Sequence, residues 1–320
     1  MKYIENKDKD VYFNLALEEY VFNNFKEDSY LLLWRNENSI VLGKHQNIYE
    51  EINTLTAEKM GVRVARRNTG GGTVFHDTGN LNYSFITHHG KDPSIEYDKF
   101  LNPVISALRS LGIPAEKRRD CDIAIEEKKI SGSAEAIKGG RILHHGTLLF
   151  NSDLSRLNEI LKPSEGKIIS KAVKSVKSPV TNIKSFMKDK NMTIEEFEEL
   201  LLKALFPKGI ERINLTDEEL VEIRELAESK YVLWAWNYGN SPKFIYEKES
   251  RLLDMDIYVK LKVDKGIILS SEITVNKISN TDIMEALQGA CYNYQVLLKR
   301  FKAIKSIENI NKEELALCFF

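Results

Sequence analysis

"VARRNTGGGTVFHDTGNLNYSFI", which runs from Val64 to Ile86, is the stretch that decides the fold. Three consecutive glycines, Gly70 to Gly72, lie in it between two runs of β-forming residues. A phosphate-binding P-loop needs Lys and then Ser or Thr after its glycines, and a dinucleotide fingerprint needs a helix behind them. Neither pattern follows here, so the flanks predict a strand, a turn and a second strand.

The glycines allow two interpretations. Glycine adopts positive φ without steric cost, so a plain turn explains one of them. Three in a row beside Arg66, Arg67 and His76 indicate a backbone that comes close to a ligand. Successive amides can bind an anion without a helix, so the stretch predicts either a plain turn or a phosphate-binding turn.

A second segment, "CDIAIEEKKISGSA" from Cys121 to Ala134, alternates apolar and polar residues around a charged turn. This alternation predicts a β-hairpin that carries Lys129 into a run of small residues. Small residues leave space for a bound group, and a lysine beside that space would neutralise a carboxylate or a phosphate. The alternative is a solvated charge near a hairpin tip.

The chain has two histidine pairs, His88–His89 and His144–His145. Neighbours on a strand point to opposite faces, which argues against metal chelation by either pair. His145, followed by Gly146 and Thr147, would line a site if the Lys129 hairpin lies next to it. Cys121 lies between two aspartates, which disfavour a thiolate and argue against a nucleophile.

Composition bounds the class of protein. The 320 residues carry a formal net charge of −1, so no global basic field points to nucleic acid or to an anionic membrane. The three cysteines are far apart, which argues against a disulfide framework or a zinc site. There is no signal-peptide pattern and no long apolar run, so we expect a soluble, cytoplasmic protein.

The remaining patterns predict helices and a second domain. Helical spacing begins near Asn14, a candidate N-cap, and capping boxes are expected at Thr193 and Thr216. The aromatic stretch Trp234–Phe244 is the predicted border, followed by a hairpin that turns at residues 264–266 and a helix near residues 281–292. We therefore predict a catalytic domain over residues 1–245 and an accessory domain over residues 246–320.

Three motifs together are more specific than any one of them: Arg66–Asp77, Lys129–Ala134 and His144–Leu157. With Ser175–Ile183 and Trp236–Phe244 they resemble the lipoate–protein ligase A family over nearly the whole chain. The resemblance implies an α+β fold shared with biotin protein ligases and class II synthetase-like cores. That fold has a mixed, largely antiparallel β-sheet with flanking helices, plus a small α+β C-terminal domain.

The resemblance also implies a reaction. Lipoate and ATP, with Mg²⁺, would form lipoyl-AMP and pyrophosphate, and octanoate is a second candidate acid. A lysine of an apo lipoyl domain of a 2-oxoacid dehydrogenase E2 subunit, or of the glycine-cleavage H protein, would then take the lipoyl group.

The site residues follow from the same resemblance. Lys129 matches the catalytic lysine that touches both lipoate and the phosphate. His145 and Gly146 are expected at the acid, and Asp122 at Mg²⁺, although cysteine replaces the family's asparagine at Cys121. The segment expected to bind the nucleotide consists of Arg67, Gly70, Gly71, Gly72, Thr73, Val74 and Phe75.

Three other functions compete with the ligase. An ATP-independent lipoyl or octanoyl transferase would use a cysteine thioester, but the cysteine of that family lies further upstream than Cys121 and transferases typically lack the C-terminal domain. A biotin ligase would show a Gly-Arg-Gly-Arg-x-Gly loop, which the sequence lacks. A non-catalytic lipoate-binding paralogue is the third alternative, because of the departure at Cys121.

Overall fold

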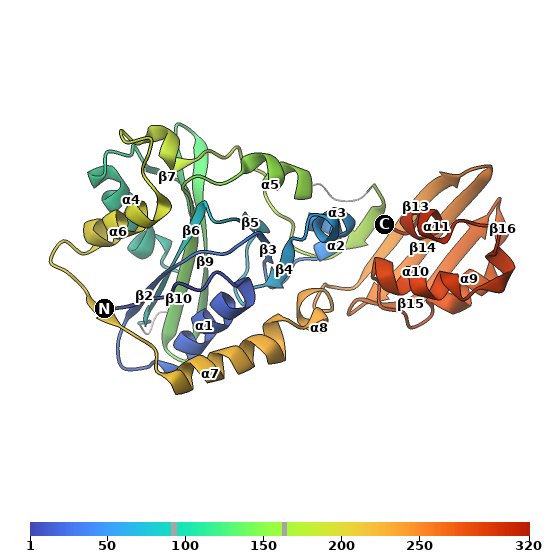
Figure 1. Ribbon diagram of the computed structural model, residues 1–320, viewed down its shortest axis with the longest axis horizontal. Helices are drawn as coiled ribbons and strands as arrows, with labels where there is room; N and C mark the ends of the chain where they lie inside the picture. Colours follow the sequence, from blue (N-terminus) through green and yellow to red (C-terminus); the bar gives the residue numbers. More distant parts are fainter. Residues whose placement is uncertain (91–94, 162–164) are drawn as a thin grey trace. The chain divides into compact units, whose positions relative to one another are not determined.

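The computed structural model describes residues 1–90, 95–161 and 165–320 (Figure 1). The chain forms two units, each built from three segments. Unit 1 consists of Met1–Lys44, Val62–Asn158 and Ser175–Leu233, and unit 2 of His45–Gly61, Glu159–Lys174 and Trp234–Phe320. The final segment of unit 2 starts before the predicted boundary at residue 246, at the first residue of the predicted aromatic border.

Unit 1 contains an eight-stranded sheet with the order β12-β1-β2-β6-β10-β9-β8-β7. Strand β1 pairs in parallel with β2 and β12, whereas the other neighbours are antiparallel, which confirms the mixed, largely antiparallel core. The strands are β1 (Lys2–Ile4), β2 (Tyr30–Trp34), β6 (Asn80–His88), β7 (Glu116–Arg119), β8 (Asp122–Ile125), β9 (Lys128–Lys138), β10 (Arg141–Leu149) and β12 (Glu211–Ile213).

Helices flank both faces of this sheet. On one face the ring of Phe85 packs against Phe100 of helix α4, within the main apolar core. On the other face Ser84 and His145 point to helix α1. The helices of unit 1 are α1 (Val11–Asn24), α4 (Tyr97–Ser110), α6 (Ile194–Leu205) and α7 (Asp217–Leu226), with a 3-10 turn η1 (Ile183–Phe186) and a π-helical turn η2 (Ala227–Tyr231).

The glycine stretch belongs to a second, three-stranded sheet of unit 1 with the order β4-β3-β5. Strand β3 (Ser39–Leu42) lies between β4 (Arg63–Arg66) and β5 (Val74–His76), parallel to β4 and antiparallel to β5. The glycines therefore join two strands that do not pair with each other. Strand, turn and strand are confirmed, but the connection crosses β3 and does not close a hairpin.

Local signals explain most element ends. The hairpin of β8 and β9 is confirmed, with positive φ angles at Glu126 and Glu127 in its tight turn. Both predicted capping boxes are present, at Thr193 and Thr216. The predicted N-cap of the first helix is wrong, because the Asp10 side chain accepts the N–H groups of residues 12 and 13. Asn14 is buried within α1 instead, where its amide donates to Arg35 O at 2.9 Å.

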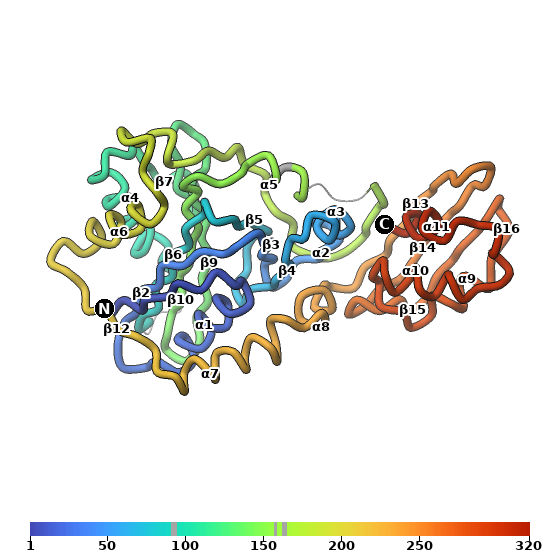
Figure 2. The backbone as a smooth tube through the Cα atoms, in the orientation of Figure 1, coloured from blue at the N-terminus to red at the C-terminus, as the bar shows by residue number. Residues whose placement is uncertain are grey.

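Unit 2 is built around a five-stranded antiparallel sheet with the order β11-β13-β14-β15-β16. The predicted turn at residues 264–266 is confirmed between β14 and β15. The strands are β11 (Lys167–Ser170), β13 (Phe244–Leu252), β14 (Met255–Asp264), β15 (Ile267–Val275) and β16 (Ile278–Ser279). In Figure 2 the colours of this unit show that early, middle and final parts of the chain contribute to it.

Short helices accompany the sheet of unit 2. The predicted helix near residues 281–292 ends early, at Leu287, and Gly289 follows it with φ of +68°. The helices are α2 (Ile48–Glu51), α3 (Thr54–Lys59), α8 (Trp234–Asn237), α9 (Thr281–Leu287), α10 (Tyr294–Lys302) and α11 (Lys312–Leu317), with a 3-10 turn η3 (Lys305–Ile307). Helix α5 (Leu154–Ile160) runs across the division between the units. Within the described residues no helix combines the length and the apolar character needed to cross a membrane.

Candidate functional site

The side chain of Arg67 lies inside the glycine turn. Its Nη2 donates to the carbonyl oxygens of Gly70 at 2.6 Å and of Gly72 at 2.8 Å. Its Nη1 donates to Val41 O at 3.0 Å and its Nε to Thr69 Oγ1 at 3.0 Å. Arg67 is 7% exposed, so a buried cation fixes the path of the turn. The predicted nucleotide-contacting arginine thus directs most of its donors to its own loop.

The glycines are needed for close approach. Gly71 has φ of +89°, and a Cβ there would lie 2.9 Å from Arg67 Nη2. A Cβ on Gly72 would lie 3.0 Å from Ser175 Oγ, which accepts the N–H of Thr73 at 2.9 Å. A larger residue at either position would displace a side chain that shapes the turn.

Lys129 lies on β9 and forms an ion pair with Asp122, with Nζ 2.7 Å from Oδ1. Its side chain is 27% exposed, whereas that of Asp122 is 3% exposed. A Cβ on Gly132 would lie 2.6 Å from Lys129 Nζ. Gly132 therefore makes room for the lysine side chain itself, whose ammonium group stays partly exposed.

One segment touches both Lys129 and the glycine turn. The Lys129 N–H donates to Pro179 O at 2.8 Å, and its carbonyl accepts the N–H of Thr181 at 3.0 Å. Four residues before Pro179, Ser175 accepts the N–H of Thr73. The motifs at residues 66–77, 129–134 and 175–183, which are remote in sequence, therefore meet in unit 1.

The consecutive histidines of β10 point to opposite faces, as predicted. His144 stacks on Phe100 with ring centroids 4.7 Å apart, and its Nδ1 lies 2.7 Å from Glu135 Oε1. Burial lowers the pKa of His144, and the hydrogen bond to Glu135 opposes that shift. His145 faces α1, while a Cβ on Gly146 would lie 2.4 Å from the Tyr83 ring, so that glycine admits a packed tyrosine.

The predicted metal ligand, Asp122, is paired with Lys129 and has the Cys121 thiol as a neighbour. Across the described ranges, no three His, Cys, Asp or Glu side chains gather as a metal site. Mg²⁺ commonly binds through one or two carboxylates plus substrate phosphates. A single carboxylate therefore fits an ion that arrives with ATP better than an ion held by the protein alone.

Cys121 lacks the features of an activated nucleophile. Burial and the neighbouring Asp122 carboxylate raise the pKa of its thiol. The thiol lies 3.7 Å from Asp122 Oδ1, to which it can donate. Because a thiolate is the reactive form, this environment disfavours attack by Cys121.

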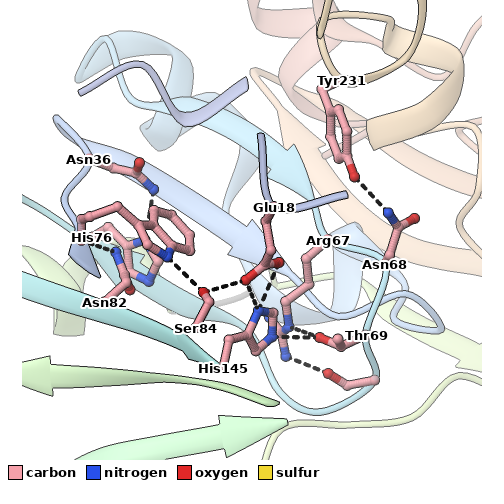
Figure 3. Close-up of polar contacts among 12 residues, drawn as sticks. Glu18, Asn36, Arg67, Asn68, Thr69, His76, Asn82, Ser84, His145 and Tyr231 are labelled. Atoms are coloured by element: carbon pink, nitrogen blue, oxygen red, sulfur yellow. Dashed lines mark hydrogen bonds and ion pairs between the residues drawn. The ribbon is translucent and has the colours of Figure 1, made fainter. Parts of the chain in front are cut away.

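Sequence reasoning missed a buried polar chain next to the turn (Figure 3). The Glu18 carboxylate accepts from Ser84 Oγ at 2.6 Å and contacts His145 Nδ1 at 2.8 Å. His145 Nε2 lies 2.7 Å from Thr69 Oγ1, the hydroxyl that also receives Arg67 Nε. A signal for Glu18 was available, because this charged residue lies at helical spacing from the apolar Val11, Leu15 and Phe22.

His76 lies close to this chain and is neutral. Its Nδ1 is 2.9 Å from Asn36 Nδ2, and its ring packs edge-on against Trp34. Burial lowers the pKa of His76 to about 3, and the charge of Arg67 acts in the same direction. An imidazolium at this position would lack the solvation that water provides.

A second cluster holds the residue before Thr69. Asn68 Nδ2 donates to Tyr231 Oη at 2.6 Å, and Asn68 Oδ1 accepts from Lys230 Nζ at 2.9 Å. Both of these η2 residues also bind Glu19 of α1. Burial by itself would raise the Glu19 pKa, but the hydrogen bonds from Lys230 and Tyr231 lower it below its usual value.

Comparison with known proteins gives a consistent result. The family profile "Lipoyl protein ligase A/B catalytic domain" matches residues 10–206. Over 324 residues the chain is 39% identical to lipoate–protein ligase 1 of Staphylococcus aureus, covering 98% of this chain and 98% of the relative.

Two solved structures share the fold of three quarters of the chain. A lipoate-protein ligase A bound with ATP superposes with a TM-score of 0.64 at 27% identity, covering 75% of this chain and 98% of that one. A bi-partite lipoate protein ligase from Thermoplasma acidophilum, solved in a study that includes its E2 lipoyl domain, gives a TM-score of 0.65 at 26% identity. It covers 75% of this chain and 96% of its own.

Proposed function

This chain belongs to the lipoyl protein ligase A/B catalytic domain family, and we propose that it is an ATP-dependent lipoate–protein ligase that works through lipoyl-AMP. The observation that carries the proposal is the meeting of Lys129 and the glycine turn on one segment, residues 175–181. A cation and a glycine-rich backbone in one place suit a reaction between a carboxylate and a phosphate.

In the first step a lipoate carboxylate oxygen attacks the α-phosphorus of ATP. A new P–O bond forms, the bond from the α-phosphorus to the bridging oxygen breaks, and pyrophosphate leaves with that electron pair. Because the two reactants are both anions, the ammonium group of Lys129 lowers the barrier by neutralising charge between them.

The nucleotide lies along the turn in this proposal. The backbone of Gly70 to Thr73 contacts the phosphates, and Val74 and Phe75 continue the site along β5. Mg²⁺ would enter with ATP, and Asp122, beside Lys129, is the carboxylate that would contact it. The ion would supply positive charge to the leaving pyrophosphate.

In the second step the amine of an acceptor lysine attacks the acyl carbon of lipoyl-AMP. The C–N bond forms, the acyl C–O bond breaks, AMP leaves with that electron pair, and the amine loses a proton to solvent. The acceptor that we favour is an E2 lipoyl domain, as in the archaeal relative, with the glycine-cleavage H protein as the second candidate. The proposed reaction requires ATP, and the cysteines are free thiols at Cys121, Cys291 and Cys318. Both features are consistent with a cytoplasmic site of action.

The test uses lipoate, MgATP and an apo E2 lipoyl domain, with pyrophosphate release and acceptor mass as readouts. Absence of pyrophosphate with lipoate and with octanoate would refute the ligase. Acyl transfer from an acyl-carrier donor without ATP, abolished in Cys121→Ser, would establish the transferase in its place.

Lys129→Ala tests the proposed catalytic residue. We expect adenylation to fall by about 100-fold or more, the range seen when a charge-stabilising group is removed. Lys128→Ala is the matched control, because this neighbour is exposed at the hairpin end and should retain activity. Wild-type adenylation in a folded Lys129→Ala protein would contradict the assigned role.

A further inference from the structure

We propose that Glu18, His145 and Thr69 are positioning residues that orient the Arg67 guanidinium and, through it, the glycine turn. The inference rests on the proposed function, because the turn is proposed to contact the phosphates of ATP. It assigns His145 a role within the protein, whereas the sequence predicted a contact with the substrate.

Hydrogen-bond directions in the chain are mutually consistent. A carboxylate can only accept, so His145 Nδ1 carries the proton that is given to Glu18, 2.8 Å away. In the tautomer with the proton on Nδ1 alone, His145 Nε2 accepts from the Thr69 hydroxyl, 2.7 Å away. The same hydroxyl accepts Arg67 Nε–H at 3.0 Å, which aligns every dipole from the arginine to the carboxylate.

The Glu18 end of this series of hydrogen bonds is also fixed. Trp34 Nε1 donates to Ser84 Oγ at 2.8 Å, and Ser84 Oγ donates to Glu18 Oε1 at 2.6 Å. Glu18 is 4% exposed and Ser84 is fully buried. Because Ser84 and His145 both contact the buried carboxylate, it has one orientation and favours the His145 tautomer with the proton on Nδ1.

Charge explains why such a chain exists. A buried guanidinium is costly unless an opposite charge and hydrogen bonds compensate it. Burial lowers the Arg67 pKa to about 10, and the charge of Glu18 opposes that shift. The Glu18 carboxylate therefore stabilises the Arg67 cation through the hydrogen bonds of His145 and Thr69, without contacting it.

Geometry at the arginine then transmits the orientation. With Nε held by Thr69, the plane of the guanidinium places Nη2 between the carbonyls of Gly70 and Gly72. Rotation of that plane would release both carbonyls and change the direction of the neighbouring N–H groups. A shift of about 1 Å at a reacting group can cost about 100-fold in rate.

The experiment compares Thr69→Val, which removes the hydroxyl at constant shape, with Thr69→Ser, which keeps it. Lipoate-dependent ATP–pyrophosphate exchange gives kcat and the KM for ATP separately. We expect Thr69→Val to lower kcat/KM for ATP by about 10- to 100-fold, and Thr69→Ser to restore most of the loss. Ser39→Ala is the control, because among the described residues its buried hydroxyl has no hydrogen-bond partner.

A second measurement detects the hydrogen bonds between Glu18, His145 and Thr69 independently of enzyme activity. In ¹⁵N NMR spectra assigned with His145→Gln, we expect the His145 tautomer with the proton on Nδ1, and a changed tautomer ratio in Glu18→Gln. A proton on Nε2 in the wild type would overturn the proposed hydrogen-bond relay from Arg67 through Thr69 and His145 to Glu18, whether or not the protein makes pyrophosphate.

Kinetic outcomes are equally decisive. Wild-type exchange in Thr69→Val, or equal impairment of folded Thr69→Val and Thr69→Ser, would overturn the positioning role. Absence of exchange in the wild-type protein refutes the ligase proposal instead, and the NMR readout then decides the relay geometry alone.

Discussion

Two adjacent arginines, Arg66 and Arg67, are both buried and donate hydrogen bonds to different segments of the backbone. Arg66 ends β4, and its Nη1 donates to Gly43 O at 3.0 Å. Arg67 turns into the glycine loop. Burial lowers the pKa of each to about 10, so both remain cations at neutral pH. At this scale the site is an arrangement of buried cations compensated by carbonyl dipoles and by Glu18.

His76 predicts a pH dependence of stability. Its folded pKa of about 3 lies well below the ordinary value of about 6.5, so between these limits the unfolded chain binds one more proton. The free energy of unfolding should therefore decrease as the pH falls from about 6.5, by up to about 1.4 kcal/mol per pH unit from this group.

The measurement is urea unfolding between pH 7 and pH 4 for the wild type and for His76→Gln. The variant should show a shallower decline over that range. His88→Gln, a change at the exposed end of β6, is the control and should keep the wild-type slope. Identical slopes for the wild type and His76→Gln would contradict the prediction.

At the scale of elements, α1 anchors the start of the glycine loop with two consecutive glutamates. Glu18 reaches Thr69 through His145, and Glu19 reaches Asn68 through the π-helical turn η2. A π-turn changes the phase of a helix, and such turns are frequent at functional sites. Here it directs the side chains of both Lys230 and Tyr231 to Asn68 and Glu19.

Tyr231→Phe tests this anchor. The change removes the hydroxyl that joins Asn68 and Glu19 in a buried setting, so we expect a loss of about 1–3 kcal/mol in the free energy of unfolding. Tyr20→Phe is the matched control. It removes an exposed bond to Glu222 and should cost within about 0.5 kcal/mol. Equal losses in urea unfolding would argue against the anchor.

At the scale of the whole molecule, unit 2 is not a simple C-terminal piece. Tyr49, from an early segment, is 4% exposed and donates to Tyr292 O. Its ring lies 4.7 Å from the Tyr292 ring. Strand β11 pairs with β13 in the same unit. Segments that come from three parts of the chain therefore share one core.

This arrangement predicts the outcome of truncation at the predicted boundary. A chain of residues 1–245 would expose Tyr49 and leave β11 without a complete partner strand. We expect it to aggregate, to bind a hydrophobic dye and to unfold at lower urea than the full chain. Tyr49→Ser in the truncated chain should recover part of the solubility. A monomeric truncated chain with the wild-type unfolding midpoint would contradict this expectation.

Local rules made much of the fold predictable. The β8–β9 hairpin, the turn at residues 264–266 and both capping boxes follow from residue patterns that act over a few positions. Failures occurred where a distant partner decided the outcome. Asn14 resembles a cap by type, yet it bonds to backbone beside β2, and Asp10 caps the helix.

The sequence by itself determined the family, the mixed α+β class and the motifs around Lys129 and the glycines, because these depend on residue type and short spacing. Tertiary structure alone decided three things. It placed β3 between the strands that flank the glycines, directed Arg67 into its own loop, and brought Glu18 to His145. The physical reason is that a buried charge selects its partners in space, and those partners lie far away along the chain.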